Sequence, residues 1–235
     1  MNIGILITGH PPVETVDIYS KYSNAFELLL SGQGFTFNSW ECLEGEFPQS
    51  VNDADGWLIT GSKYGAYEDL PWIEPLENFI RSAYNSDLPI VGICFGHQIL
   101  AQALGGKVEK FDGGWSAGRV EYDLDGHKNP LSLYAWHQDQ VVSLPEDATV
   151  VGSTPFCQYA ALSYKRKAYS LQPHPEFSSE FFSRLFEARK EGLPQSAIDQ
   201  AENSIKENLP TDSAVIAETI AASVSYTHLT LPTKA

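Results

Sequence analysis

The chain is poor in cysteine and in basic residues, and it contains no long apolar run. Three cysteines in 235 residues do not make a disulfide framework. Lys and Arg total 15 against 30 acidic residues, and this net charge of −15 disfavours binding to nucleic acid or to anionic membranes. No apolar run approaches the roughly 20 residues of a membrane-spanning helix, and no secretory signal precedes the first strand pattern. We therefore expect a cytoplasmic protein with neither a nucleic-acid nor a membrane partner.

Apolar residues make up 43% of the chain, which is enough for a sizeable core. In the first half, short apolar runs alternate with segments of helical spacing. The alternation predicts an α/β fold with a mostly parallel central sheet flanked by helices. We expect strands at 3–7, 35–40, 57–60 and 90–93, and helices at 17–30, 72–84 and 96–104.

The second half changes character, with short alternating segments separated by Gly, Asp, Asn and Pro. This pattern predicts a small antiparallel extension of the sheet, followed by helices. The expected strands are 119–122, 140–144, 149–152, 158–163 and 169–172, and the expected helices are 178–190, 197–208 and 212–222. Because there is no internal repeat or low-complexity linker, we expect residues 1–223 to form a single domain.

The end of the chain departs from these patterns. The segment Val224-Ser-Tyr-Thr-His-Leu-Thr-Leu-Pro-Thr233 has no helical period. It is similar to the in-frame translation of a transposase-type sequencing adapter. We interpret residues 224–235 as a non-native or disordered tail.

Cys94 lies where an apolar, β-branched run ends and a helical pattern begins. Gly92 and Gly96 flank it, each two residues away. This Gly-x-Cys-x-Gly spacing is typical of a nucleophile elbow, a sharp strand-to-helix turn that exposes the side chain. A thiolate at a helix N-terminus is stabilised by the positive end of the helix dipole. The alternative is a buried structural cysteine that closes a core strand.

A second polar motif follows a later strand, in the segment Gln172-Pro-His-Pro-Glu176. His174 can accept the proton of a thiol and return it to a leaving amine, and Glu176 can hold the imidazole in the required tautomer. In isolation such a motif is more simply a surface turn. Together with the Cys94 elbow upstream, it predicts a Cys-His-Glu triad.

The segment Gly92-Ile-Cys-Phe-Gly-His-Gln98, together with residues 172–176, resembles the class I (triad-type) glutamine amidotransferase domain. The resemblance covers roughly residues 3–190 and implies the flavodoxin-like fold of that family. It implies that Cys94 is the nucleophile, His174 the base and Glu176 the carboxylate that orients the base.

The resemblance also implies further site residues. The backbone N–H of Phe95 and a loop at Gly61 and Ser62 would form the oxyanion hole, although the family usually has Gly-Gly-Pro in that loop. Gln98 matches a family position near the bound glutamine, and His137 lies in a second motif near the substrate pocket. No metal or cofactor is implied, and the chain's histidines lack the clustered spacing of zinc ligands.

The implied reaction is cleavage of the γ-carboxamide of glutamine through a cysteine thioester, which gives glutamate and ammonia. The chain has neither a P-loop nor the Ser-Gly-Gly-x-Asp signature of ATP pyrophosphatases. It therefore resembles stand-alone proteins similar to the amidotransferase part of GMP synthase, and a separate synthetase subunit would receive the ammonia. Two alternatives stay open: a self-contained hydrolase of γ-glutamyl peptides or amides, and an inactive regulatory or binding module. The complete triad argues against the inactive module.

Overall fold

The computed structural model describes residues 1–165 and 168–225. One half of its main sheet is parallel and comprises β1 (Asn2–Ile7), β2 (Thr36–Glu41), β3 (Gly56–Ile59), β4 (Ile90–Ile93) and β11 (Ala168–Leu171). These strands lie in the order β2-β1-β3-β4-β11. All neighbouring pairs in this order are parallel. The predicted mostly parallel sheet is confirmed.

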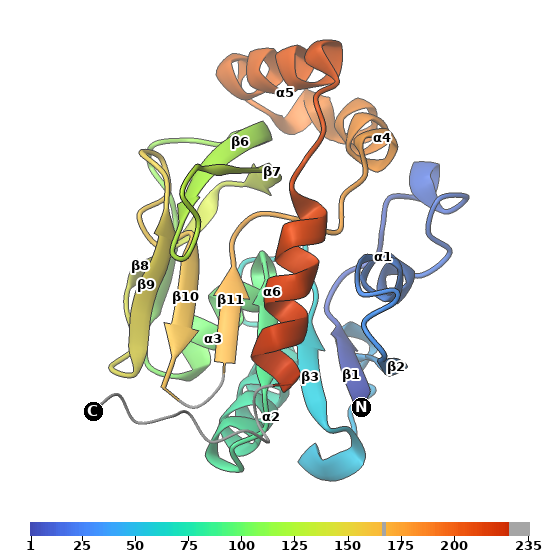
Figure 1. Cartoon of the computed structure of the whole chain (residues 1–235), viewed down its shortest axis with the longest axis vertical. Coiled ribbons are helices and arrows are strands. Elements are labelled where there is room, and N and C mark those ends of the chain that lie inside the picture. Colours follow the sequence, from blue (N-terminus) through green and yellow to red (C-terminus); the bar gives the residue numbers. More distant parts are fainter. Residues whose placement is uncertain (166–167, 226–235) are drawn as a thin grey trace.

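The other half of the sheet is antiparallel and continues from β11 without a break (Figure 1). It comprises β6 (Ser116–Leu124), β7 (Leu131–His137), β9 (Ala148–Ser153) and β10 (Ala161–Tyr164). A separate antiparallel pair contains β5 (Lys107–Lys110) and β8 (Asp139–Ser143). The antiparallel extension was expected, but β5 and β7 were not among the expected strands.

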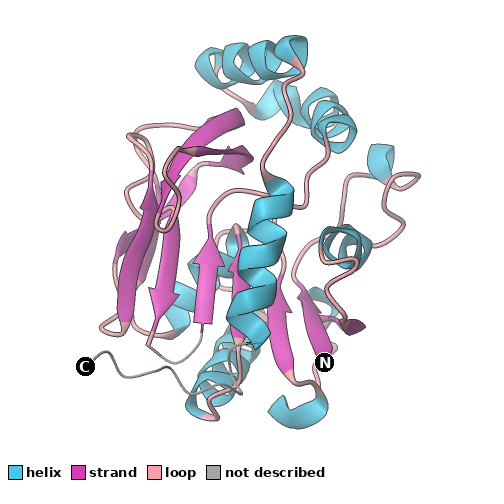
Figure 2. Cartoon of the chain, viewed as in Figure 1, coloured by secondary structure: helices cyan, strands magenta, loops and turns pink. Residues whose placement is uncertain are grey.

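Helices cover both faces of the parallel half and also lie above the sheet in the view of Figures 1 and 2. They are α1 (Tyr22–Leu29), α2 (Ile73–Asn85), α3 (Phe95–Ala103), α4 (Ser179–Arg189), α5 (Gln195–Glu207) and α6 (Ser213–Ser225). The α6 helix crosses the front of the sheet in Figure 1, α2 lies behind it, and α4 and α5 are found above it. Short 3₁₀ turns span Val13–Thr15, Cys42–Glu44, Val51–Asp53 and Lys190–Gly192.

Alternate residues of the parallel strands fill two separate cores. Leu58 and Val91 pack in the same core as residues of α1 and α6. Trp57 and Ile59 belong to the other core, with residues of α2 and α3. Successive side chains of a strand point to opposite faces, so a sheet covered on both faces needs nearly continuous apolar strands. This explains why these strands read as short apolar runs.

The first helix begins later than expected. Asn24 Oδ1 accepts a hydrogen bond from the Lys21 N–H at 3.0 Å, and α1 starts at Tyr22. At the other end of the chain, α6 continues through Ser225, and Val224 is buried. Two residues of the predicted tail therefore belong to a helix, and 226–235 lie outside the described residues.

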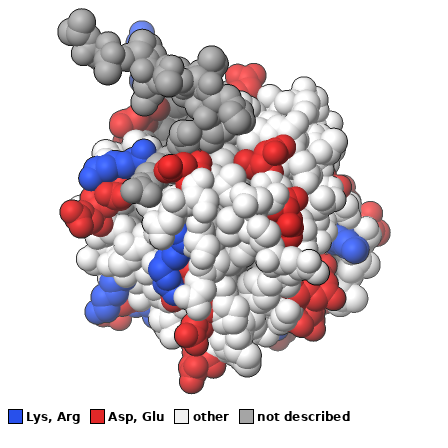
Figure 3. Space-filling view, turned by 90° about the horizontal axis from the view of Figure 1, so that it is seen from below, with Lys and Arg blue, Asp and Glu red and all other residues white. Residues whose placement is uncertain are grey.

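The lower end of the molecule in Figure 1 is shown in Figure 3. Acidic side chains are spread over this face, with basic ones scattered among them. Within residues 1–165 and 168–225, none of the helices combines the length and the apolar character that crossing a membrane requires.

Candidate active site

Cys94 lies in a strained turn between β4 and α3. Its backbone has φ 54° and ψ −105°, a conformation that costs a residue with a side chain about 1–3 kcal/mol. A Cβ atom on Gly92 would overlap the carbonyl of Gly96, and a Cβ on Gly96 would overlap the carbonyl of Ile59. The two glycines therefore let the turn pack closely against its neighbours, as the Gly-x-Cys-x-Gly spacing predicts.

The sheet brings Cys94 and His174 together at the carboxyl ends of neighbouring strands. The β4 and β11 strands are parallel neighbours, with Ile93 opposite Leu171. The Cys94 N–H donates to the Leu171 carbonyl at 2.8 Å. Three residues after Leu171, the His174 N–H donates to the carbonyl of Tyr134 at 2.8 Å. This hydrogen bond holds the backbone of His174 against β7.

His174 and Glu176 form a buried hydrogen-bonded pair beside the thiol. The His174 Nδ1 lies 2.6 Å from Glu176 Oε1. Burial by itself would lower the pKa of His174. The negative charge and hydrogen bonding of Cys94 and of Glu176 outweigh that effect and raise the pKa to about 10. A raised pKa favours the protonated imidazole, whose Nδ1 hydrogen then lies on Glu176 Oε1.

Three contacts of this group were not expected from the sequence. The Tyr22 O–H donates to Glu176 Oε1 at 2.9 Å. Phe177 stacks on the His174 ring, with the ring centroids 4.0 Å apart. The Gln172 side chain points its Nε2 at Cys94 Sγ, 3.7 Å away. Gln172 and Phe177 adjoin the His-Pro-Glu motif, but no spacing in the sequence could have indicated Tyr22.

The loop after β3 passes directly beside the thiol. A Cβ atom built on Gly61 would lie 3.7 Å from Cys94 Cβ and 3.1 Å from His174 Cε1. Gly61 and Ser62 line the same cavity as Cys94. Phe95 is the first residue of α3, where backbone N–H groups have no partner within the helix. The structure therefore places all the predicted oxyanion-hole residues around the thiol.

Gln98 and His137 also line the cavity. The Gln98 side-chain amide donates to Gln172 Oε1 at 3.1 Å and to the Asp139 carbonyl at 2.9 Å. Burial lowers the pKa of His137 to about 3, so its ring is neutral. His137 Nε2 is buried and has no hydrogen-bond partner among the described residues.

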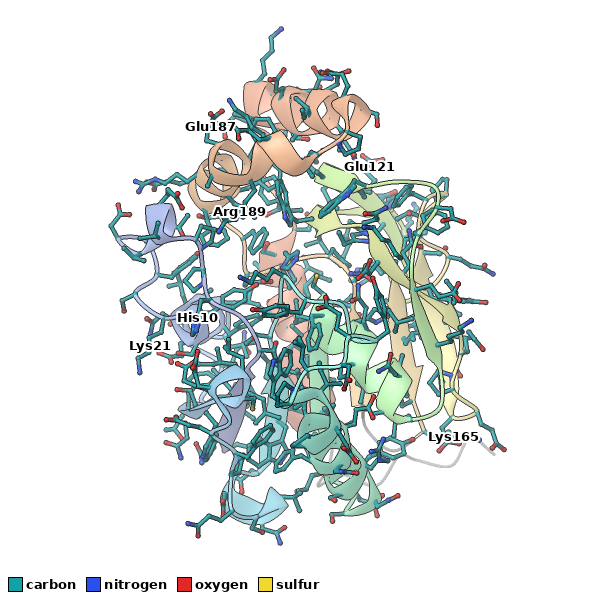
Figure 4. All side chains as sticks on the ribbon, turned by 180° about the vertical axis from the view of Figure 1, so that it is seen from behind. His10, Lys21, Glu121, Lys165, Glu187 and Arg189 are labelled. Carbon is teal, nitrogen blue, oxygen red and sulfur yellow. The ribbon has the colours of Figure 1, made fainter. Side chains whose placement is uncertain are left out.

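The cavity has a volume of about 450 Å³, within the range of small-molecule sites. It runs between the loop after β1 and the end of α4, which Figure 4 marks with His10 and Arg189. Its lining combines charged and polar side chains with a set of apolar ones. As for metals, no three His, Cys, Asp or Glu side chains of the described part of the chain lie close enough together to hold an ion.

Comparisons with known proteins agree with this geometry. The family model "Glutamine amidotransferase class-I" matches residues 15–189. A glutamine amidotransferase-like protein of Schizosaccharomyces pombe is 31% identical, over 93% of this chain and 96% of that protein. Gamma-glutamyl peptidase 4 of Arabidopsis thaliana is 31% identical, over 69% of this chain and 70% of its own length.

Two further comparisons are with a GMP synthase subunit and with a solved structure. One subunit of the glutamine-hydrolyzing GMP synthase of Methanococcus aeolicus is 39% identical, over 46% of this chain and 61% of its own length. The crystal structure of a glutamine amidotransferase from Methylobacillus flagellatus superposes with a TM-score of 0.78 at 21% identity, covering 96% of this chain and 93% of that one. This likeness confirms the predicted fold. The matched model covers more than half of the sequence, and the chain belongs to the class I glutamine amidotransferase family.

Proposed function

We propose that Cys94, His174 and Glu176 form a catalytic triad that hydrolyses the γ-carboxamide of glutamine. The observation that carries the proposal is the buried His174–Glu176 pair, 2.6 Å apart, directly beside a thiol in a strained elbow. A buried structural cysteine needs neither a charged imidazole nor a strained backbone. A nucleophile benefits from both.

In the first half of the reaction, the Cys94 thiolate attacks the γ-carbonyl carbon of glutamine. The negative charge that develops on the carbonyl oxygen is stabilised by the N–H of Phe95 and by the Gly61–Ser62 loop. His174 then gives its proton to the departing nitrogen. The C–N bond breaks, ammonia leaves, and a γ-glutamyl thioester on Cys94 remains.

In the second half, water replaces ammonia beside His174. The neutral imidazole takes a proton from this water, which attacks the thioester carbonyl. The C–S bond breaks, glutamate leaves, and the thiolate–imidazolium pair forms again. Glu176 orients the imidazole throughout and stabilises its protonated form, because its carboxylate stays in contact with Nδ1.

The first candidate concerns the destination of the ammonia. As a proposal, a separate synthetase subunit takes it up, and the similarity to one of the GMP synthase subunits supports this reading. The protein would then be nearly idle on glutamine until the partner binds. We place the reaction in the cytoplasm, and the free thiols of Cys42, Cys94 and Cys157 suit a reducing compartment.

A specific observation favours a second candidate, the hydrolysis of γ-glutamyl peptides or amides without any partner. Besides the residues around the thiol, the lining of the cavity includes apolar side chains of α4 and Arg189. A leaving group as small as ammonia needs no such space. The similarity to a gamma-glutamyl peptidase supports this candidate as well.

One assay separates these candidates from an inactive module. The purified chain is incubated with glutamine and with a panel of γ-glutamyl dipeptides, and released glutamate is measured. An ammonia-supplying subunit turns over little of either substrate, a peptidase hydrolyses dipeptides unaided, and Cys94→Ala abolishes every activity. Cys157→Ala, which removes another buried free thiol, is the control and should stay active. Full activity in Cys94→Ala would refute the proposed triad. A second measurement compares the rates at which the thiols of Cys94 and Cys157 are alkylated. If Cys94 is alkylated no faster than Cys157, the chain is an inactive module.

A further inference from the structure

The residues that line the cavity at Cys94 fall into two groups, which we call its polar end and its apolar end. The polar end contains Tyr67, Glu68, Lys110, Gln138 and Asp139. The apolar end contains Trp115, Trp136, Phe177, Phe181, Leu185 and Leu193, with Arg189 at its far side. The inference below rests on the proposed hydrolysis at Cys94. It concerns which part of a γ-glutamyl substrate occupies each end.

The polar end matches the α-groups of a γ-glutamyl chain. Glu68 and Asp139 provide two carboxylates for an α-ammonium, and Lys110 provides a cation for an α-carboxylate. Asp139 is electrostatically coupled to both of the other charges and is hydrogen-bonded to Tyr67, so these side chains lie close together. An apolar surface would leave both α-groups of the glutamyl chain unpaired, at a considerable desolvation cost.

The apolar end begins at His174, the residue that gives a proton to the leaving nitrogen. Phe177 stacks on the His174 ring, and the ring of Phe181 lies 4.7 Å from that of Phe177. Residues four apart lie on the same side of a helix, so Phe181, Leu185 and Arg189 form one stripe along α4. The stripe leads away from His174 and defines where a leaving group would lie.

Two tryptophans form another wall of the apolar end. Trp136 lies on β7 and Trp115 directly precedes β6, and their ring centroids are 6.1 Å apart. Both are only partly buried in the structure and face the cavity. Such a pair of aromatic rings gives an apolar side chain a large contact area.

Arg189 differs from the basic residues beside it. Arg184 pairs with Asp17 and Glu180, and Lys190 pairs with Glu187. Arg189 is exposed, lines the cavity and makes no salt bridge with any residue in the described ranges. A guanidinium at the open end of an apolar channel is suited to a carboxylate at the end of the substrate.

The distance between Phe181 and Arg189 limits the length of the leaving group. The rise from Phe181 to Arg189 is about 12 Å, at about 1.5 Å per residue. An extended chain covers about 3.3–3.6 Å per residue, and a helical side chain leans back toward the helix N-terminus. A leaving group of one or two residues, together with the arginine side chain, spans this distance.

We propose that the apolar end is a leaving-group subsite for γ-glutamyl amides of an amino acid or dipeptide with a large apolar side chain and a free C-terminal carboxylate. Cys94 Sγ bonds to the γ-carbonyl carbon, and the amide C–N bond breaks. The leaving nitrogen takes the His174 proton, so the product is a free amino acid or dipeptide. Water then hydrolyses the thioester to glutamate. No other reactant is required.

The test compares γ-glutamyl-phenylalanine, its C-terminal amide, γ-glutamyl-glycine and glutamine as substrates of the full chain. We expect kcat/KM for γ-glutamyl-phenylalanine to exceed that for γ-glutamyl-glycine about 10-fold or more, because a large apolar side chain is buried. Arg189→Gln should raise the KM for γ-glutamyl-phenylalanine about 10-fold and leave its C-terminal amide almost unaffected. Lys190→Gln, which changes the next cation on the helix, should leave all substrates unaffected.

A binding measurement keeps the test independent of turnover. In the Cys94→Ala variant, calorimetry should show tighter binding of γ-glutamyl-phenylalanine than of γ-glutamyl-glycine, and Arg189→Gln in that background should remove most of the difference between the acid and its amide. Equal affinities, or an equal effect of Arg189→Gln on acid and amide, would overturn the subsite. If glutamine is hydrolysed while the apolar dipeptide has no advantage, the subsite fails and the triad stands. If the dipeptide binds as expected but no substrate is cleaved, the triad fails and the subsite stands.

Discussion

Tyr22 and Glu176, 154 residues apart in sequence, meet in a 2.9 Å hydrogen bond beside the thiol. The tyrosine donates to the same oxygen, Oε1, that contacts His174. Burial, and next to it the charge of Glu176, raise the pKa of Tyr22, so the phenol stays protonated and remains a donor. The helix that carries Tyr22 thus fixes the rotamer of the carboxylate that orients the base.

Substitutions of this pair should reduce catalysis to different degrees. Glu176→Gln removes the charge that stabilises the imidazolium, and kcat/KM should fall about 10²- to 10⁴-fold. Tyr22→Phe removes one hydrogen bond to a charged group, and kcat/KM should fall about 10-fold. Steady-state kinetics on the best substrate measure both effects. Tyr164→Phe, at a tyrosine buried in the other core, should stay within twofold of the original. A larger loss in Tyr22→Phe than in Glu176→Gln would contradict this ranking.

The stability of the protein should depend on pH through His174. Its pKa is raised from 6.5 to about 10 by Cys94 and Glu176, against the opposing effect of burial. A raised pKa means that the imidazolium stabilises the fold fully below pH 6.5 and that this contribution is lost as the pH rises toward 10. The free energy of unfolding should therefore fall over this window more steeply than in His174→Gln. Urea unfolding at several pH values measures the difference, and parallel curves for the two proteins would disprove it.

Gly61 should not tolerate a methyl group. A Cβ at this position would lie 2.8 Å from the Tyr22 hydroxyl oxygen and 3.1 Å from His174 Cε1, so both side chains would have to move. We expect Gly61→Ala to lower kcat about 100-fold or more, because the base and the oxyanion loop lose their alignment. Gly192 is the matched control. It lines the same cavity, but a Cβ there meets nothing within 4 Å, so Gly192→Ala should stay active. Similar losses in both variants would mean that packing at Gly61 is not the cause.

Gln172 should affect the reactivity of the thiol. Its Nε2 faces Cys94 Sγ at 3.7 Å, and its Oε1 accepts from Gln98. Gln172→Glu places a carboxylate beside the thiolate, so iodoacetamide should alkylate Cys94 about 10-fold more slowly at neutral pH. Gln140→Glu is the control, since Gln140 is buried on β8 and bonded to the Phe156 carbonyl. An unchanged alkylation rate in Gln172→Glu would show that the amide does not stabilise the thiolate.

The parts of the site that follow from local patterns could be predicted. The turn at Cys94 depends on residues only two positions away, Gly92 and Gly96, whose close contacts exclude any side chain. The adjacency of Cys94 and His174 follows from a parallel sheet, in which the carboxyl ends of neighbouring strands lie side by side at one end of the sheet. Sequence patterns carry both kinds of information directly.

Other parts depend on contacts that no local pattern encodes. The β7 strand lacks the alternation of a half-exposed strand because it is covered on both sides. Tyr134 on this strand stacks on Phe182, with the ring centroids 4.4 Å apart. Tyr22 has its role only because α1 packs beside the strand ends. Likewise, the stripe from Phe181 to Arg189 looks like an ordinary amphipathic helix until the cavity is seen beside it.

Because β3, β4 and β11 lie in the interior of the sheet, the geometry of the site depends on the global stability of the domain. The oxyanion loop, the thiol and the base each follow one of these adjacent strands. Interior strands of a sheet usually open only when the whole domain unfolds, whereas edge strands open locally. Fraying of β2, at one edge of the sheet, would leave the three strand ends in register, whereas β7 at the other edge holds His174 through the Tyr134 carbonyl. Thermal inactivation should therefore coincide with the loss of hydrogen-exchange protection at the amides of β4 and β11, and not with its earlier loss at the amides of β2.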